Sequence, residues 1–432
     1  MKKMKRKINC LLLALFFIPL GLLAQNRQIR LAEVEQWAAM HFPLLVQKTL
    51  ANERAAVAKS NLGKNYLPQV NVNAQATWQN AVPELPVKIQ LPGFEIDPVN
   101  KDQYRAIIDV SQLLYDGGSI RLQKQLAELE AIVKSLQTDA QFEPMRERVT
   151  QLYFSGLLVN EQKQLMQTAM EDIALGINKV EAQVQNGIAF RSHLATLQTE
   201  ELKIKQQLSE LEIQRLAILE MLSLFTGQHL DASVVLTDEK PEMRFMANRN
   251  LENRPEWKLF SAQDSLALMQ ATLADIRTRP KLSAFAQGGY GNPGLNMLKN
   301  EFSPMFMTGI RFNWNLSAFY SRDNDHKLAS IQQREIAAQK ENFIMQTNAR
   351  LNDEATKMQR LEELLKTDGE IIVLRQQIKE ASKAQLDHGV INANDYIREV
   401  NAENQAILQQ KIHELQLLQA QRNYKLITGQ TQ

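Results

Sequence analysis

The residues best suited to chemistry, the histidines and the single cysteine, form no familiar catalytic or metal-binding pattern. No two histidines have the His-Glu-x-x-His spacing that holds zinc. The six are His41, His193, His229, His326, His388 and His413. With Cys10 as the only cysteine, a disulfide framework and a cysteine metal cluster are both excluded. The sequence therefore predicts no bound metal.

Other signatures of catalysis are missing from the sequence as well. The run Gly288-Gly289-Tyr290-Gly291 lacks the Lys-Ser/Thr that completes a phosphate-binding loop, and no Gly-x-Ser-x-Gly elbow occurs. The scattered methionines suit helix packing better than copper binding. A formal net charge of +2 argues against a nucleic-acid partner. We expect a protein that is not an enzyme and has no cofactor.

The composition indicates long helices. The 432 residues include only 17 glycines and 13 prolines, and 6% are aromatic. A chain with so few helix breakers can form long uninterrupted helices.

The N-terminus is expected to be a secretory signal peptide over residues 1–24. A basic head at residues 2–7 precedes an apolar stretch at 11–23, and Ala24 suits the cleavage site. An uncleaved membrane anchor is the alternative. The mature chain would be exported and would contain no cysteine. It has no run of about 18 apolar residues, so no membrane-spanning helix is predicted.

The rest of the chain reads as a tandem repeat. Matching residues lie 212 positions apart early in each copy and 202 positions apart later: Pro43 and Pro255, Pro68 and Pro280, Gly187 and Gly389, Thr226 and Thr428. The ten-residue difference falls between Trp78 and Tyr104. The predicted repeats are residues 25–235 and 236–432, each with a helix, a β-hairpin, a long helix and a returning helix.

The two predicted hairpins, at about 68–116 and 280–317, alternate apolar and polar residues, as a strand with two different faces does. Their polar faces are rich in Asn and Gln, and the strands have the length of tilted membrane-spanning strands. A sheet with one face in water is the alternative. The residues expected to face the membrane are Val70, Val72, Trp78, Ile108, Val110, Ile310, Phe312 and Trp314.

Four strands are too few to close a barrel, since small barrels need about 8. An open sheet edge in lipid would leave backbone groups unpaired. If the strands lie in a membrane, several subunits must share the barrel.

Helical periodicity follows each hairpin. Residues 119–185 would form about 100 Å of helix, with a counterpart from about 321 to 387. Gly187 and Gly389 then mark turns, after which Ser192 and Asn394 are the expected N-caps. Residues seven apart, Ile204, Leu211, Ile218 and Phe225, predict a coiled-coil seam.

In this order, twice, the motifs resemble the outer-membrane efflux protein family, of which TolC is the best-known member. The motifs are Asn253-Arg254-Pro255-Glu256, Leu113-Leu114-Tyr115-Asp116-Gly117-Gly118, the turns at Gly187 and Gly389, and the helix ends at Thr226-Gly227 and Thr428-Gly429. The resemblance implies a mainly α fold: a tandem-repeat protomer with long coiled-coil helices in an α-barrel. Four strands per chain would join a small β-barrel shared by a trimer.

The resemblance also implies a passive conduit in the outer membrane of a Gram-negative bacterium, with its helical body in the periplasm. The homotrimer would be the exit duct of a tripartite efflux or type I secretion system, with a periplasmic adaptor and an inner-membrane pump as partners. The turns expected to dock the adaptor are Gly187, Ile188 and Ala189, and Gly389, Val390 and Ile391.

The two turns differ in how they match the family's pattern. Asp395 follows the second turn as the family has it, whereas His193 replaces the acid after the first turn. Glu380, just before the second turn, is a pore-gate candidate by the same resemblance, although a solvated helix face also explains it. The alternative to a channel is a periplasmic coiled-coil scaffold that only touches the membrane.

Overall fold

The computed structural model describes residues 27–82, 99–237, 249–297 and 299–430. The expected signal peptide, residues 1–24, lies outside the described residues. So does most of the stretch between Trp78 and Tyr104, in which the two predicted repeats differ in length.

The described chain is mainly helical, which confirms the predicted fold class. Its helices are α1 (Leu31–His41), η1 (Pro43–Leu45), α2 (Val46–Lys64), α3 (Ser119–Gln185), α4 (Arg191–Thr226), α5 (Pro255–Arg277), α6 (Ala318–Asp387) and α7 (Ala393–Ile427). The strands are β1 (Arg27–Ile29), β2 (Gln69–Trp78), β3 (Asp102–Tyr115), β4 (Val234–Leu236), β5 (Lys281–Asn292) and β6 (Ser303–Asn313). Among the described helices, none combines the length and the apolar character needed to cross a membrane.

The chain divides into two compact units, each built from both predicted repeats. The helical unit comprises Met1–Phe42, Phe142–Arg249 and Arg350–Gln432, and the sheet unit comprises Pro43–Gln141 and Asn250–Ala349. Helices α3 and α6 each contribute residues to both units.

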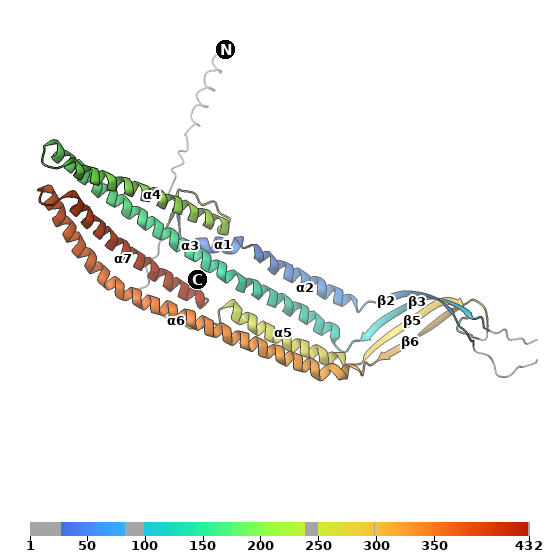
Figure 1. The fold of residues 1–432 in the computed structure, drawn as a ribbon. Coiled ribbons are helices and arrows are strands. Elements are labelled where there is room, and N and C mark those ends of the chain that lie inside the picture. The colour runs from blue at the N-terminus through green and yellow to red at the C-terminus, as the bar shows by residue number, and fades with distance from the viewer. Residues whose placement is uncertain (1–26, 83–98, 238–248, 298, 431–432) are drawn as a thin grey trace, which may run out of the picture. The chain divides into compact units, whose positions relative to one another are not determined.

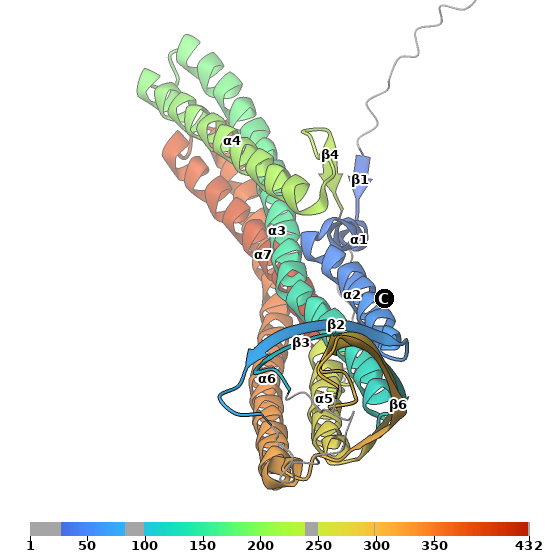
Figure 2. The same cartoon turned by 90° about the vertical axis from the view of Figure 1, so that its right-hand side faces the viewer.

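One antiparallel sheet with the strand order β2-β3-β5-β6 dominates the sheet unit. Strands β2 and β3 pair from Gln69↔Ser111 to Trp78↔Asp102, and β5 and β6 pair from Lys281↔Asn313 to Gly291↔Ser303. Strands β3 and β5 join the two hairpins, with an irregularity at Leu113/Tyr115. Figure 1 shows the four strands side by side, and Figure 2 shows that the sheet they form is curved.

A short turn connects β3 to α3. Gly117 and Gly118 have φ values of +72° and +92°, a region that glycine enters without steric cost. The Asp116 carboxylate accepts hydrogen bonds from the backbone N–H groups of Gly118 (2.9 Å) and Ile120 (2.6 Å), so it caps the new helix. Behind this turn, Leu122, Leu126 and Ile276 join α3 to α5 in a small apolar cluster.

In the helical unit, α4 returns along α3 and α7 returns along α6 (Figure 1). The predicted seam of α4 is confirmed: Ile204 and Ile218 are buried, and Leu211 and Phe225 are partly buried against the core. The parallel pair β1–β4 contributes Ile29, Val234 and Leu236 to the buried cluster of this unit. The buried Tyr153 hydroxyl lies 2.8 Å from the Ile29 carbonyl and 2.7 Å from the Thr237 carbonyl, which ties both segments to α3.

Candidate functional site

The sheet has one continuous apolar face, because its registers place the apolar residues of all four strands in common rows. One row runs Val72, Ile108, Gly288, Phe306, and the next runs Val70, Val110, Ala286, Thr308. Val72 is 74% exposed and Phe306 is 69% exposed in the single chain. So large a contiguous apolar surface on one subunit indicates contact with lipid or with another apolar partner.

The residues predicted to face a membrane fall mainly on this apolar face. Val70, Val72 and Trp78 lie in β2, Ile108 and Val110 in β3, and Ile310 and Phe312 in β6. Trp314 lies one residue beyond the end of β6. Its indole N–H donates to the Thr278 carbonyl at 2.9 Å, which holds the ring at the border between sheet and helices.

The opposite face of the sheet is mainly polar, although Ile107, Met305 and Met307 also lie on it. Gln69, Asn71, Asn73 and Gln75 alternate with the apolar residues of β2 and are exposed. On the same face, the Gln287 side chain donates to the Asp109 carboxylate. Phe285 breaks the predicted alternation, and the structure shows why it is tolerated: the Arg311 guanidinium lies over its ring, 4.8 Å from the centroid.

The sheet ends in two unpaired edges. Within the described residues, β2 pairs only with β3, and β6 pairs only with β5. Each outer strand therefore has a row of backbone groups available to another strand. In hydrocarbon these groups must be paired, because no water is there to bond them.

The first helix turn, between α3 and α4, is closed by Gly187 at a φ of +73°. The backbone N–H of Ile188 donates to the Gln183 carbonyl at 2.8 Å, and the N–H of Gly187 donates to the Val184 carbonyl at 3.1 Å. This is the Schellman arrangement, which requires a left-handed residue at the glycine position.

The second turn, between α6 and α7, repeats this geometry. Gly389 has a φ of +69°. The N–H of Val390 donates to the Gln385 carbonyl at 2.8 Å, and that of Gly389 to the Leu386 carbonyl at 3.0 Å. The structure thus confirms both glycines as left-handed caps.

The side chains that follow the glycines point in two directions. Ile188 and Val390 are each 71% exposed, whereas Ala189 and Ile391 pack against the cluster formed by the four helix ends. Phe190, which sequence reasoning missed, is also exposed and stands edge-on to His193. Each turn therefore exposes one apolar side chain next to a residue that packs against the helix-end cluster.

The expected N-caps, Ser192 and Asn394, are wrong. Helix α4 starts after Phe190, which makes no side-chain cap, and α7 starts after Asn392. The Asn392 side chain accepts from the N–H of Asp395 at 3.1 Å. Both helices begin earlier than predicted because the Schellman turns need only a few residues. Asp395 sits in the first turn of α7, where a negative charge is favoured.

Glu380 is exposed on α6 and forms no ion pair among the described residues. The residue before it behaves differently: Lys379 lies 3.1 Å from the Asp172 carboxylate on α3 and 2.5 Å from Glu403 on α7. Burial lowers the pKa of Lys379, but its hydrogen bonds to Glu403 and Asp172 outweigh this and raise the pKa overall. No sequence signal pointed to Lys379.

The apolar cluster around these ion pairs joins the ends of all four long helices. Leu197 of α4 and Tyr396 of α7 are buried there, together with Ile173 of α3 and Leu386 of α6. A second ion pair, Lys179–Asp387 at 2.5 Å, links α3 to α6 close to the turns. Among the residues that the structure describes, no group of three or more His, Cys, Asp or Glu side chains could hold a metal ion.

Comparison with known proteins finds similar solved structures but no sequence match. No protein-family model matches the sequence, and no curated protein sequence matches it either. Among solved structures, the chain is similar to CusC, which forms a transmembrane channel. The TM-score is 0.67 and the sequence identity is 13%, over 92% of each chain.

Two further solved structures are similar. The CmeC outer-membrane channel of Campylobacter jejuni has a TM-score of 0.64 and 15% identity, over 92% of this chain and 85% of CmeC. The MtrE outer-membrane channel of Neisseria gonorrhoeae has a TM-score of 0.66 and 15% identity, over 93% and 89% of the two chains. The chain therefore has the fold of these channels, as the resemblance in its motifs implied.

Proposed function

We propose that this protein is one subunit of an outer-membrane export channel, the passive exit duct of a tripartite efflux or type I secretion system. The observation that carries the proposal is the four-stranded sheet, which has an exposed apolar face, a polar face rich in Asn and Gln, and two free edges. The similarity to solved outer-membrane channels over nine-tenths of the chain supports it.

The free edges argue for a barrel shared between subunits, and the resemblance to the outer-membrane efflux protein family favours a homotrimer. Strands β2 and β6 run antiparallel to each other in the sheet order, so β2 of one subunit can pair with β6 of the next. Three copies supply twelve strands, above the roughly 8 that a closed barrel needs. The apolar face would then lie in the outer membrane, the polar face would line a water-filled passage, and the helices would extend into the periplasm.

The helix turns are the proposed docking surface for a periplasmic adaptor that connects the duct to an inner-membrane pump. Ile188 and Val390 offer exposed apolar contacts on turns whose backbone is fixed by Gly187 and Gly389, with Ala189 and Ile391 packed beneath. Glu380, exposed shortly before the second turn, remains a proposed pore-gate residue. The duct itself would perform no catalysis, and the pump would supply the energy.

Membrane fractionation followed by imaging tests this proposal. The protein should remain in the outer-membrane fraction through salt and alkaline washes and should be released only by detergent. Detergent-purified particles should show threefold symmetry. Release by salt alone, or monomeric particles, would instead indicate a periplasmic scaffold attached to the membrane surface.

A further inference from the structure

The polar face of the sheet carries more positive than negative charge. Its charged side chains are Arg105, Lys281 and Arg311 against Asp109, since residues opposite one another in the register share a face. Asp109 accepts a hydrogen bond from the Gln287 side chain, so part of its capacity is already used.

The positive charge concentrates where the sheet meets the helices. Arg277, Arg279 and Lys281 follow one another at every second position across the end of α5 and the start of β5, and all three are exposed. Lys281 lies opposite Asn313, and Arg311 is two residues from Asn313 on the same face. Such diagonal neighbours are about 7–8 Å apart, so their charges act on the same volume of solvent.

No carboxylate of the described residues forms an ion pair with any member of this basic cluster, which we define as Arg277, Arg279, Lys281 and Arg311. Arg279 donates to the Gly117 carbonyl at 3.0 Å, and Arg311 lies over the Phe285 ring. These contacts orient the two guanidinium groups and leave their charge uncompensated. Like charges held together without counter-charges repel one another, so the grouping of these four charges does not itself add to stability.

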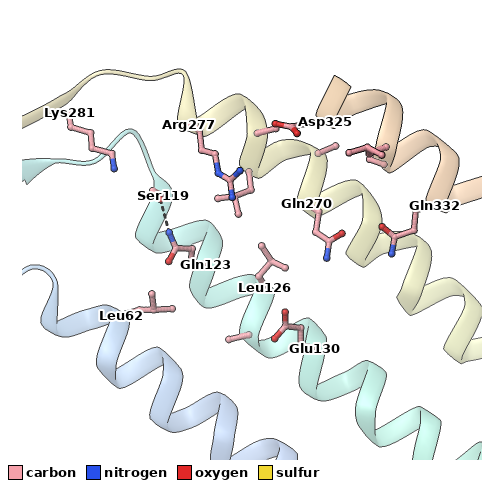
Figure 3. A pocket seen from close by; sticks show the side chains of 16 residues that line it. Leu62, Ser119, Gln123, Leu126, Glu130, Gln270, Arg277, Lys281, Asp325 and Gln332 are labelled. Atoms are coloured by element: carbon pink, nitrogen blue, oxygen red, sulfur yellow. Dashed lines mark hydrogen bonds between the residues drawn. The ribbon is translucent and has the colours of Figure 1, made fainter. Parts of the chain in front are cut away.

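Three members of the cluster, Arg277, Arg279 and Lys281, line a cavity of about 500 Å³. Its other polar walls are the side chains of Asn313, Asn315, Ser317 and Ser321, which are neutral hydrogen-bonding groups. A cavity of roughly 830 Å³ adjoins it, and Arg277 and Lys281 also line this one. Figure 3 shows both side chains extending from the α5–β5 junction into that space, with Glu130 further along α3 and Asp325 on α6. The wall thus changes from basic at the sheet to mixed charge along the helices.

We propose that the basic cluster is a selectivity element that favours anionic solutes in the water-filled passage. This rests on the proposed channel function, because the polar face lines the passage only if the sheet is part of a shared barrel. A cleft lined by one sign of charge concentrates counter-ions and repels co-ions. Three subunits would place the cluster around the passage as a ring, where a negatively charged solute exchanges part of its hydration for guanidinium and ammonium groups.

Reversal potentials in planar lipid bilayers test this inference. The purified channel is placed in a gradient of KCl near 0.1 M, where charges act over about 10 Å. The triple variant Arg277→Gln, Lys281→Gln and Arg311→Gln should lower the chloride-to-potassium permeability ratio at least about twofold relative to the unaltered channel. The difference should shrink near 1 M, where the screening length is about 3 Å. Arg279 is kept, because it holds the turn at Gly117.

A matched control changes the net charge by the same amount elsewhere. Lys203→Gln, Lys205→Gln and Lys366→Gln remove three charges that already pair with Glu200, Glu201 and Glu363, and the ratio should stay unchanged. If the triple variant does not assemble, the single variant Lys281→Gln, which disturbs no described contact, is measured instead. It should shift the permeability ratio in the same direction. Equal ratios in the unaltered channel and the cluster variants, or an equal shift in the control, would overturn the inference. Absence of any conductance in the unaltered protein would instead overturn the channel function itself.

Discussion

Lys379 on α6 lies 3.1 Å from the carboxylate of Asp172 on α3, and this ion pair joins helices of the two predicted repeats near their turns. The Lys379 side chain is only 20% exposed, and Glu403 of α7 completes the site at 2.5 Å. Three helices thus meet at one partly buried cation, which makes their relative position sensitive to a single charge.

Replacing Lys379 with methionine should destabilise the helical unit. The substitution keeps much of the side-chain volume but leaves two carboxylates facing each other, at a cost of about 1–3 kcal/mol at this degree of burial. The measurement is thermal unfolding of the detergent-purified protein, followed by helical circular dichroism. Lys366→Met is the control, because its pair with Glu363 is exposed on both sides and is worth about 0–1 kcal/mol. Equal melting temperatures for the two variants would contradict the structural role of Lys379.

Tyr396 gives this region a spectroscopic signature. Burial, followed by the nearby Asp172 carboxylate, raises the pKa of its phenol from 10.0 to about 12. Because the folded-state pKa is the higher one, the folded protein retains a proton that the unfolded chain loses. Its contribution to stability is therefore present below pH 10 and lost as the pH rises toward about 12. The ultraviolet difference titration between the unaltered protein and Tyr396→Phe should show one phenol ionising near that upper value, and ionisation near 10 would contradict the burial of Tyr396.

Replacing either turn glycine, Gly187 or Gly389, with alanine should destabilise the protein. A side chain at Gly187 or Gly389 meets no heavy atom within 4 Å, so the cost of alanine there is only the left-handed backbone, about 1–2 kcal/mol for each turn. Gly369→Ala is a control of opposite sign. It lies within α6, where a side chain also meets open space, so alanine should stabilise the helix by about 0.5–1 kcal/mol. If all three substitutions changed the melting temperature in the same direction, the conformation of the turns would be wrong.

The outward residues of the turns should matter for docking and little for folding. The double variant Ile188→Ser and Val390→Ser removes two apolar side chains that are largely exposed in the single chain. The free energy of unfolding should therefore change by less than about 0.5 kcal/mol. Co-purification of the channel with its periplasmic adaptor after cross-linking should be lost. Leu202→Ser, a comparably exposed apolar position on α4, should retain it. Retention of the adaptor by the double variant would place the docking surface elsewhere.

Local sequence patterns were sufficient for much of the fold. The alternation in residues 68–116 predicted two faces of a sheet, and the left-handed glycines followed from their place between long helical segments. The predicted span of α3, residues 119–185, matches the structure. Each of these features depends on neighbours within a few residues, which is where sequence patterns are informative.

Contacts between residues far apart in the sequence could not be predicted from local patterns. Lys379 and Asp172 are 207 residues apart and do not correspond in the repeat, so nothing in the sequence links them. The family resemblance singles out Glu380, whereas the buried contacts belong to its neighbour Lys379. The basic cluster is only partly local: Arg277, Arg279 and Lys281 are close in the sequence, whereas Arg311 approaches Lys281 only through the pairing of β5 with β6.

We propose that the two faces of the sheet contact different media, lipid on one side and water on the other, and single-cysteine labelling in intact outer membranes can distinguish them. Cys10 is the only natural cysteine and falls in the expected signal peptide, so an introduced thiol would be unique in the mature chain. Cysteines at Val70, Asn71, Val72 and Asn73 along β2 should react alternately with a charged, water-soluble maleimide. Positions 71 and 73 should be labelled, and positions 70 and 72 should react only after detergent is added. Equal labelling of all four positions without detergent would show that water reaches both faces, and the membrane assignment of the sheet would be wrong.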